Sequence, residues 1–208
     1  MIKSFKRIHS GISQRYFWFQ QKFIHNFSFI HIKKCGGTSI EHFLGIPKTH
    51  DTAAQRIQRI GLKKWEENFT FSIVRNPYSR VVSYYKWFIK KYQLEGHDQM
   101  VTLNEWVASA YKERNMDLLN NPFNQASCYD SVALDNQIIV KNIIKLETLD
   151  DEWEKLCHDL RIKYKPLNVK NQTSMHTTKN ALDLLNDSNK AIIRDHFKND
   201  FEAFGYEQ

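Results

Sequence analysis

The sequence predicts a three-layer α/β fold with a central, mainly parallel sheet that is flanked by helices. Two short apolar runs, residues 27–32 and 69–74, are rich in aromatic and β-branched residues and are typical of buried strands. Each run stops abruptly, and a turn and then apolar residues at helical spacing follow it. Strands that alternate with helices in this way favour a parallel sheet covered on both faces.

The remaining elements follow from periodicity and capping signals. Asp51 and Gly61 suit the two ends of one helix, Pro77 suits the start of another, and Thr102 with Glu105 forms a capping box for a third. In chain order we expect helices at 38–45, 51–61, 77–92 and 102–111, a polar loop at 113–137, one or two strands at 138–146, and helices at 149–160 and at 188–201, the last starting at Ser188.

The length of 208 residues indicates one domain. Residues 1–26 are basic and aromatic without a clean period, so we expect them to form an extension or a short helix. Residues 27–208 are then expected to form the single domain. A net charge of +7 indicates an anionic partner, either nucleic acid, an anionic membrane face or a charged nucleotide.

The cysteines indicate a reducing compartment. Cys35, Cys128 and Cys157 are odd in number and widely spaced, which is not the pattern of a disulfide framework. No apolar run approaches the roughly 18 residues that a membrane span needs, and the start of the chain lacks a signal-peptide pattern. We therefore expect a cytoplasmic protein without a transmembrane segment. The residues do not indicate an oligomeric state.

The first chemical motif follows the strand at 27–32, and its residues are Lys33, Lys34, Cys35, Gly36, Gly37, Thr38 and Ser39. A strand that leads through glycines into a helix directs backbone N–H groups and the positive end of the helix dipole at one point, which suits a phosphate-like anion. The lysines precede the glycines, whereas in the nucleotide-kinase loop the lysine follows them. A turn with incidental lysines is the alternative interpretation.

The second motif follows the strand at 69–74. Arg75 lies at the strand end, where parallel sheets present ligand-binding groups, and Ser83 follows about two helical turns later. Arg75 can bind a phosphate through two parallel hydrogen bonds. Surface ion pairs of Arg75 and Arg80 are the alternative. Two such motifs in one sheet indicate a ligand with two separated anionic groups.

Together these residues resemble the sulfotransferases that use 3′-phosphoadenosine 5′-phosphosulfate (PAPS), especially the branch of the Golgi carbohydrate sulfotransferases and their bacterial relatives. In that family a Pro-Lys-x-Gly-Gly-Thr-Ser loop binds the 5′-phosphosulfate, and an Arg-Asn-Pro-x-x-Arg-x-x-Ser segment binds the 3′-phosphate. Both occur here in that order, with Lys33 in place of the proline. The resemblance covers about residues 27–206 and implies a P-loop-type fold.

The resemblance implies specific roles. Lys33 to Ser39 would bind the 5′-phosphosulfate, Arg75 and Ser83 would bind the 3′-phosphate, and Lys34 would be the catalytic lysine. The reaction would move the sulfuryl group to a hydroxyl acceptor, a carbohydrate by this resemblance, and release 3′-phosphoadenosine 5′-phosphate (PAP). Lys170 and Thr173, together with Lys179, lie where the family has a polar loop near the nucleotide.

The family also has a general base between the two motifs, and His50 fits that placement, with Glu41 as the other candidate. His31 lies on the predicted strand and is expected to be a packed core residue. Gln125 in the long loop is a weaker candidate for an acceptor contact. The histidines and cysteines show no close metal-ligand spacing, so no metal site is expected.

Two other functions stay open on the residues alone. A P-loop phosphotransferase of the kinase type would need Mg²⁺ and a nucleoside triphosphate, but no strand ends in an Asp suited to hold Mg²⁺. A basic nucleic-acid-binding module would use the lysines and aromatic residues of 1–26 and 84–92, but these carry no known nucleic-acid motif. We therefore expect no nucleic-acid partner.

Overall fold

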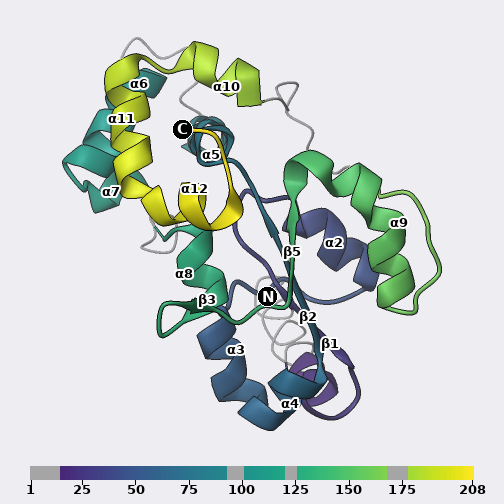
Figure 1. The fold of residues 1–208 in the computed structure, drawn as a ribbon. Coiled ribbons are helices and arrows are strands. Elements are labelled where there is room, and N and C mark those ends of the chain that lie inside the picture. The colour runs from purple at the N-terminus through teal and green to yellow at the C-terminus, as the bar shows by residue number, and fades with distance from the viewer. Residues whose placement is uncertain (1–14, 93–100, 120–125, 168–177) are drawn as a thin grey trace, which may run out of the picture. The chain divides into compact units, whose positions relative to one another are not determined.

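The structure, a computed structural model, describes residues 15–92, 101–119, 126–167 and 178–208. The chain divides into two compact units. The first comprises Met1–Ile73 with Asp130–Lys170, and the second comprises Val74–Tyr129 with Asn171–Gln208. The first contains the central sheet, and the second is built from helices (Figure 1).

The central sheet has the strand order β1-β2-β5 in the described part of the chain, with β1 at Phe27–Ile30, β2 at Phe69–Val74 and β5 at Asn142–Lys145. β1 and β2 run parallel, with Phe29 opposite Phe71, and these two rings stack with their centroids 4.9 Å apart. The predicted α/β fold with a central parallel sheet flanked by helices is confirmed. The bounds of β2 are those expected from the sequence.

Several helices of the first unit pack beside this sheet. The rings of Phe43 and Trp153 meet edge to face at 4.9 Å and join the helices α2 and α9, which Figure 1 shows beside β5. Residues 15–23 are also helical, and Phe17 and Gln21 on this helix are buried. The elements are α2 (Gly37–Leu44), α3 (Ala53–Ile60), α4 (Leu62–Glu67), the 3₁₀ turn η3 (Leu146–Thr148), α9 (Leu149–Asp159), and a hairpin of β3 (Ala133–Leu134) and β4 (Gln137–Ile138).

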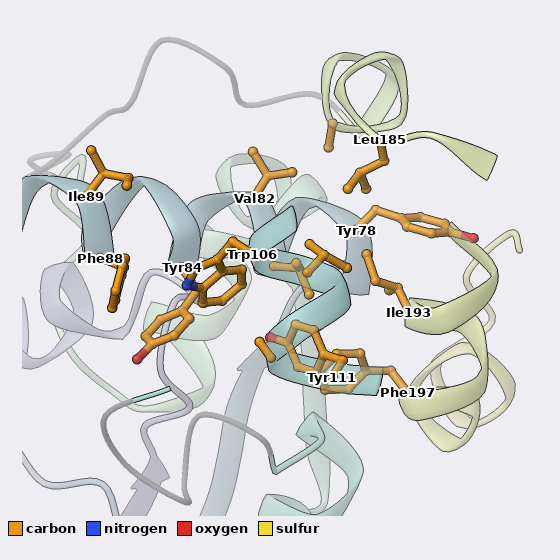
Figure 2. Packing of buried hydrophobic residues seen from close by; sticks show 14 of the residues in the cluster. Tyr78, Val82, Tyr84, Phe88, Ile89, Trp106, Tyr111, Leu185, Ile193 and Phe197 are labelled. Carbon is orange, nitrogen blue, oxygen red and sulfur yellow. The ribbon is translucent and has the colours of Figure 1, made fainter. Parts of the chain in front are cut away.

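The second unit packs its helices around an aromatic core. Trp106 is fully buried, and the rings of Tyr84, Phe88 and Tyr111 lie 5.5 to 6.0 Å from its ring (Figure 2). The helices are α5 (Pro77–Tyr92), α6 (Leu103–Val107), the π-helical turn η1 (Ala108–Lys112), α7 (Met116–Leu119), α10 (Thr178–Leu184), α11 (Asp187–His196) and α12 (Lys198–Phe204). The chain passes from the first unit to the second between Ile73 and Val74 in β2 and returns to the first within α8 (Cys128–Val132).

Three local predictions were wrong. The N-cap of α3 is Thr52, whose side chain forms a capping box with Gln55, and not Asp51. Residues 113–137 are not one loop, because they contain α7, α8 and β3. The helix expected at 188–201 is two helices, since α11 begins under the N-cap Asn186 and ends at His196, before α12.

The helices of the described residues are too short or too polar to span a bilayer.

Candidate functional site

The glycine loop connects β1 to α2. β1 ends at Ile30, and α2 begins at Gly37 with Gly36 as its N-cap. Gly36 adopts a left-handed conformation with φ +78° and has no side chain to cap the helix. The first N–H groups of a helix lack the i−4 carbonyl partner that later ones have, so this N-terminus suits an external anion. Lys33 and Lys34 precede it and are half-buried.

Packing requires a glycine at position 37, whereas at Gly36 the backbone conformation is the stronger requirement. A Cβ atom at Gly37 would lie 2.5 Å from Nε2 of His31, and one at Gly36 would lie 2.7 Å from Cδ1 of Leu146. A methyl group at either position therefore collides with a neighbouring side chain. The loop is held against His31 on one side and Leu146 on the other.

Cys35 belongs to the framework of this loop. It is fully buried, its N–H donates to the carbonyl oxygen of Ile32 at 3.3 Å, and its thiol lies 3.6 Å from the carbonyl oxygen of Lys33. Ser39 donates its N–H to the carbonyl oxygen of Gly36 and is half-buried, whereas Thr38 is exposed. These contacts close the turn before α2 starts.

The second motif follows β2 directly. Arg75 comes after Val74 and is 7% exposed. Asn76 caps α5, because its Oδ1 accepts N–H bonds from Tyr78 at 3.0 Å and Ser79 at 3.4 Å. Pro77 is the first residue of α5, as expected, and Ser83 lies half-buried within this helix. Since β1 and β2 are parallel neighbours, each motif leaves the carboxyl end of one of two adjacent strands.

Arg80 has a different role from the one that the alternative interpretation gave it. It is buried, donates from Nη2 to the carbonyl oxygen of Ala126 at 2.8 Å, and has Nη1 3.8 Å from Oδ2 of Asp200. Its guanidinium also lies over the ring of Phe197. The alternative of a surface ion pair is therefore wrong for Arg80, which is buried and joins α5 to α12.

Glu41 and His31 form a buried pair. Nδ1 of His31 lies 2.7 Å from Oε1 of Glu41, and both side chains are almost fully buried. The same Glu41 oxygen accepts the backbone N–H of Thr49 at 3.0 Å. Glu41 thus connects α2 to the end of β1 and to the segment before α3. His31 is buried, as the sequence predicted.

His50 lies next to this pair and is half-buried. Its Nδ1 is 3.2 Å from the carbonyl oxygen of His31, and the two imidazole rings are 4.4 Å apart. Because a carbonyl oxygen only accepts, Nδ1 carries the hydrogen in the neutral ring and Nε2 carries the lone pair. Burial, then the charges of His31, Lys33 and Lys48, lower the pKa of His50 to about 4. At neutral pH its imidazole is therefore in the form that accepts a proton.

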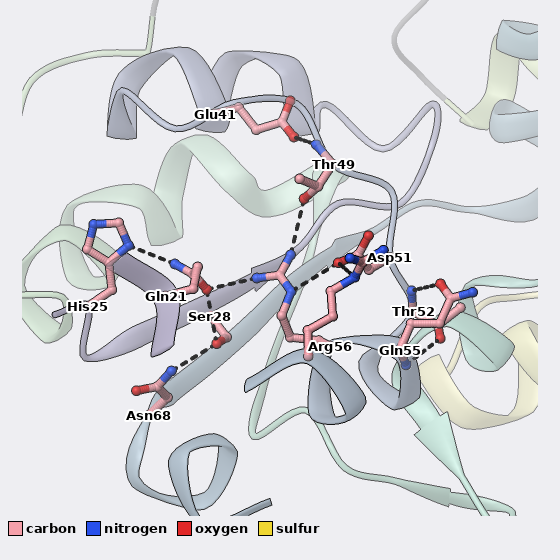
Figure 3. Close-up of polar contacts among 11 residues, drawn as sticks. Gln21, His25, Ser28, Glu41, Thr49, Asp51, Thr52, Gln55, Arg56 and Asn68 are labelled. Carbon is pink, nitrogen blue, oxygen red and sulfur yellow. Dashed lines mark hydrogen bonds and ion pairs between the residues drawn. The ribbon is translucent and has the colours of Figure 1, made fainter. Parts of the chain in front are cut away.

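Arg56 is a buried residue near His50 that sequence reasoning missed. It is 1% exposed and contacts Gln21, Thr49 and Asp51 (Figure 3). The available signal was its position in α3, where Ala53, Arg56 and Ile60 share the buried face at helical spacing. An arginine on an apolar face indicates a buried polar cluster.

Three of the predicted residues, Gln125, Lys170 and Thr173, lie outside the described residues, and so does the side chain of Lys179. In the part of the chain that the structure describes, no group of three His, Cys, Asp or Glu side chains could hold a metal ion.

A sequence model described as "Sulfotransferase family" matches residues 17–207. The match contains both motifs, the segment with His50, and most of the helix at residues 15–23. No curated protein and no solved structure gives a significant match to the chain.

Proposed function

Because the chain belongs to the sulfotransferase family, we propose that it transfers the sulfuryl group of PAPS to a hydroxyl group of a carbohydrate in the cytoplasm. The family establishes a sulfotransferase enzyme and sulfuryl transfer in general. The observation that supports the proposal is that the adjacent parallel strands β1 and β2 are each followed by a turn with basic residues and then by a helix.

The first motif is proposed to bind the 5′-phosphosulfate. The start of α2 fits an anion, because Gly36 caps it without a side chain and Lys33 and Lys34 precede it. Cys35, Gly36 and Gly37 would give the loop its shape, and Thr38 and Ser39 would add hydroxyl donors. Lys33 stands in place of the family's proline and adds a positive charge there.

The second motif is proposed to bind the 3′-phosphate. Arg75 offers a planar guanidinium at the end of β2, and Ser83 offers a hydroxyl group from α5. Lys170 and Thr173 are proposed to close over the nucleotide. All of these groups bind anions without a metal ion.

Bound PAPS supplies the sulfuryl group, which gains a bond to the acceptor oxygen as its bond to the bridging oxygen of the nucleotide breaks and PAP leaves. Lys34 would stabilise the negative charge that develops on that bridging oxygen, and losing one such donor typically costs about 3 kcal/mol of transition-state stabilisation. Nε2 of His50 would accept the proton of the acceptor hydroxyl group. A pKa of about 4 keeps this nitrogen unprotonated at neutral pH, and the same shift makes it a weaker base than an ordinary imidazole.

A carbohydrate acceptor and a cytoplasmic location have separate support. The carbohydrate follows from the resemblance of both motifs to the branch that sulfates carbohydrates. The proposed location is supported by Cys35, Cys128 and Cys157, which are buried thiols that no disulfide joins.

Thermal denaturation with nucleotides tests the proposal. PAP without divalent metal should raise the melting temperature, and at a hundredfold its Kd it would add about 2.7 kcal/mol of stability. Stabilisation by ATP with Mg²⁺ but not by PAP would contradict it and favour a phosphotransferase. Transfer of ³⁵S-sulfate from labelled PAPS to a panel of saccharides and other alcohols then tests the acceptor. Labelling of only non-saccharide alcohols would keep the donor and reject the carbohydrate.

A further inference from the structure

Arg56 is an arginine in an apolar environment. It lies on the buried face of α3, and only 1% of the residue is exposed. Burial lowers the pKa of Arg56, and the negative charge of Asp51 opposes this shift. A buried guanidinium is costly unless its N–H groups are paired, so its partners show what the residue does.

The guanidinium holds both chain neighbours of His50. Nη2 donates to Oγ1 of Thr49 at 3.1 Å, and Nε donates to Oδ2 of Asp51 at 3.4 Å. Figure 3 shows these two contacts diverging from one guanidinium group toward a single segment of chain. Residues 49 and 51 are therefore fixed from the same side chain.

Two further contacts fix the same segment. The N–H of Thr49 donates to Glu41 at 3.0 Å, and Nδ1 of His50 donates to the carbonyl oxygen of His31 at 3.2 Å. Each of the three consecutive residues 49, 50 and 51 is thus held by at least one hydrogen bond, Thr49 from α2 and α3, His50 from the residue that follows β1, and Asp51 from α3. The imidazole of His50 has little freedom to rotate as long as these contacts persist.

The far side of Arg56 rests on the helix at residues 15–23. Its Nη1 donates to Oε1 of Gln21 at 2.9 Å, and its guanidinium lies 5.0 Å from the ring of Trp18. Gln21 is itself held, because its Oε1 accepts from Ser28 at 3.4 Å and its Nε2 lies 2.7 Å from Nδ1 of His25. The contacts with Gln21 and Trp18 thus fix the guanidinium group that also binds Thr49 and Asp51.

We infer that Arg56 is a positioning residue, which orients the imidazole of His50 for proton acceptance by holding Thr49 and Asp51. The inference rests on the proposed role of His50 as the base. Lysine cannot replace Arg56 in this role, because an ammonium group lacks the planar set of donors that reaches three partners at once.

The first test compares Arg56→Lys with Arg59→Lys. Arg59 is a matched control, since it also lies on α3 and 3.5 Å from Asp51, but its side chain is 53% exposed. We expect Arg56→Lys to lower kcat for ³⁵S transfer to the best acceptor of the saccharide panel at least about tenfold, because misplaced groups lose rate steeply. The KM for PAPS should stay unchanged, and Arg59→Lys should change neither constant.

The second test is an NMR titration of the His50 imidazole, which needs no acceptor. Groups that face His50 are His31, Lys33 and Lys48, and all of them remain in the variants. If Arg56→Lys releases the imidazole toward solvent, its pKa should rise from about 4 toward the ordinary value of 6.5. Arg59→Lys should leave the pKa of His50 at about 4. A change in overall stability alone would not move this pKa.

Thr49→Val provides a variant that keeps the buried arginine. It removes only the hydroxyl acceptor of Arg56. If Arg56→Lys does not fold, this variant still tests whether Arg56 orients His50. It should lower kcat in the same direction but less, and the double variant Arg56→Lys/Thr49→Val should lose less than the product of the two single losses.

The outcomes separate the inference from the proposed function. Wild-type kcat and an unchanged His50 pKa in both Arg56→Lys and Thr49→Val would overturn the inference, even if His50→Ala abolishes transfer. Full transfer by His50→Ala would remove His50 as the base, and with it the inference, while leaving PAPS-dependent transfer intact. Absence of transfer from PAPS by the wild-type protein would instead count against the proposed function.

Discussion

The imidazole ring of His31 occupies the space that a side chain at Gly37 would need. A Cβ atom built at Gly37 would lie 2.6 Å from Cγ of His31, well inside van der Waals contact. The ring cannot easily move away, because Nδ1 lies 2.7 Å from Oε1 of the buried Glu41. Gly37 is therefore fixed by its contact with the residue that follows β1.

Gly37→Ala should destabilise the protein even without a nucleotide. Overpacking of this kind typically costs about 1–3 kcal/mol, which urea denaturation of the free protein can measure. In the His31→Ala background the same change should cost clearly less, since the colliding ring is gone. An equal cost in both backgrounds would show that this contact does not determine the glycine.

Gly45→Ala is the control for backbone strain. Gly45 has φ +65° and nothing within 4 Å of its Cβ position, so only the left-handed conformation opposes alanine there. A cost of about 1 kcal/mol is expected, and it should not depend on His31.

Lys34 and Arg75 should differ in the step that they affect. Lys34→Ala should lower kcat by about a hundredfold, as is typical for the loss of one transition-state donor, and should weaken PAP binding far less. Arg75→Ala should mainly weaken PAP binding, because it removes a paired contact to the 3′-phosphate. Calorimetric titration with PAP and ³⁵S transfer measure the two effects, and a reversed pattern would show that the roles are misassigned.

His50 should make stability depend on pH. Its pKa in the folded protein is about 4, below the ordinary 6.5, so between these values the unfolded chain binds more protons than the folded one. The free energy of unfolding should therefore fall as the pH decreases from about 6.5 to about 4 and recover above that window. In His50→Gln this fall should be smaller.

His25 requires a control in the same experiment. Burial, then the charge of Lys64, lower its pKa too, so it contributes with the same sign. The difference between wild type and His50→Gln removes its contribution. Identical pH profiles for the two proteins would contradict the expected effect of His50.

Asp200→Asn should strongly destabilise the second unit. The carboxylate accepts N–H bonds from Cys128 at 2.9 Å and Tyr129 at 2.7 Å and faces Arg80. Burial raises the pKa of Asp200, and the charge of Arg80 opposes that rise. An amide loses the charge and one acceptor, and breaking a buried pair costs about 3–5 kcal/mol.

Glu202→Gln is a suitable comparison for Asp200→Asn in urea denaturation. Glu202 lies on the same helix, but its ion pair with Lys198 is exposed, so its removal should leave stability nearly unchanged. Similar small losses in both variants would show that the buried carboxylate is not an important link.

The strand β2 could be predicted from local sequence. The run Phe69–Val74 is apolar throughout and ends at a charged turn, so its bounds were clear. The start of α3 was harder, since Asp51 and Thr52 both suit an N-cap. Thr52 is the N-cap because Gln55 completes a capping box with it. The side chain of Asp51 instead pairs with Arg56 and Arg59.

The contacts around the candidate site could not be read from local patterns. Gln21 and Arg56 are 35 positions apart, and nothing in either segment indicates that they meet. The pairing of His31 with Glu41 depends on how α2 folds back beside β1, which is a tertiary relationship. Short helices such as α4 were also missed, because its six residues hold one buried anchor, Trp65. The sequence pattern predicted where the two turns lie. The side chains that hold these turns depend on tertiary packing, which the pattern does not show.

The burial of all three thiols has a practical consequence for labelling. Cys35, Cys128 and Cys157 are at most 1% exposed, so maleimide reagents should find no native target on the folded protein. A cysteine introduced at an exposed position in each unit and outside both motifs, for instance at Lys63 and at Glu202, would then be the labelled site. Energy transfer between such a pair would report directly on how the two units respond to a nucleotide, without first removing a native cysteine.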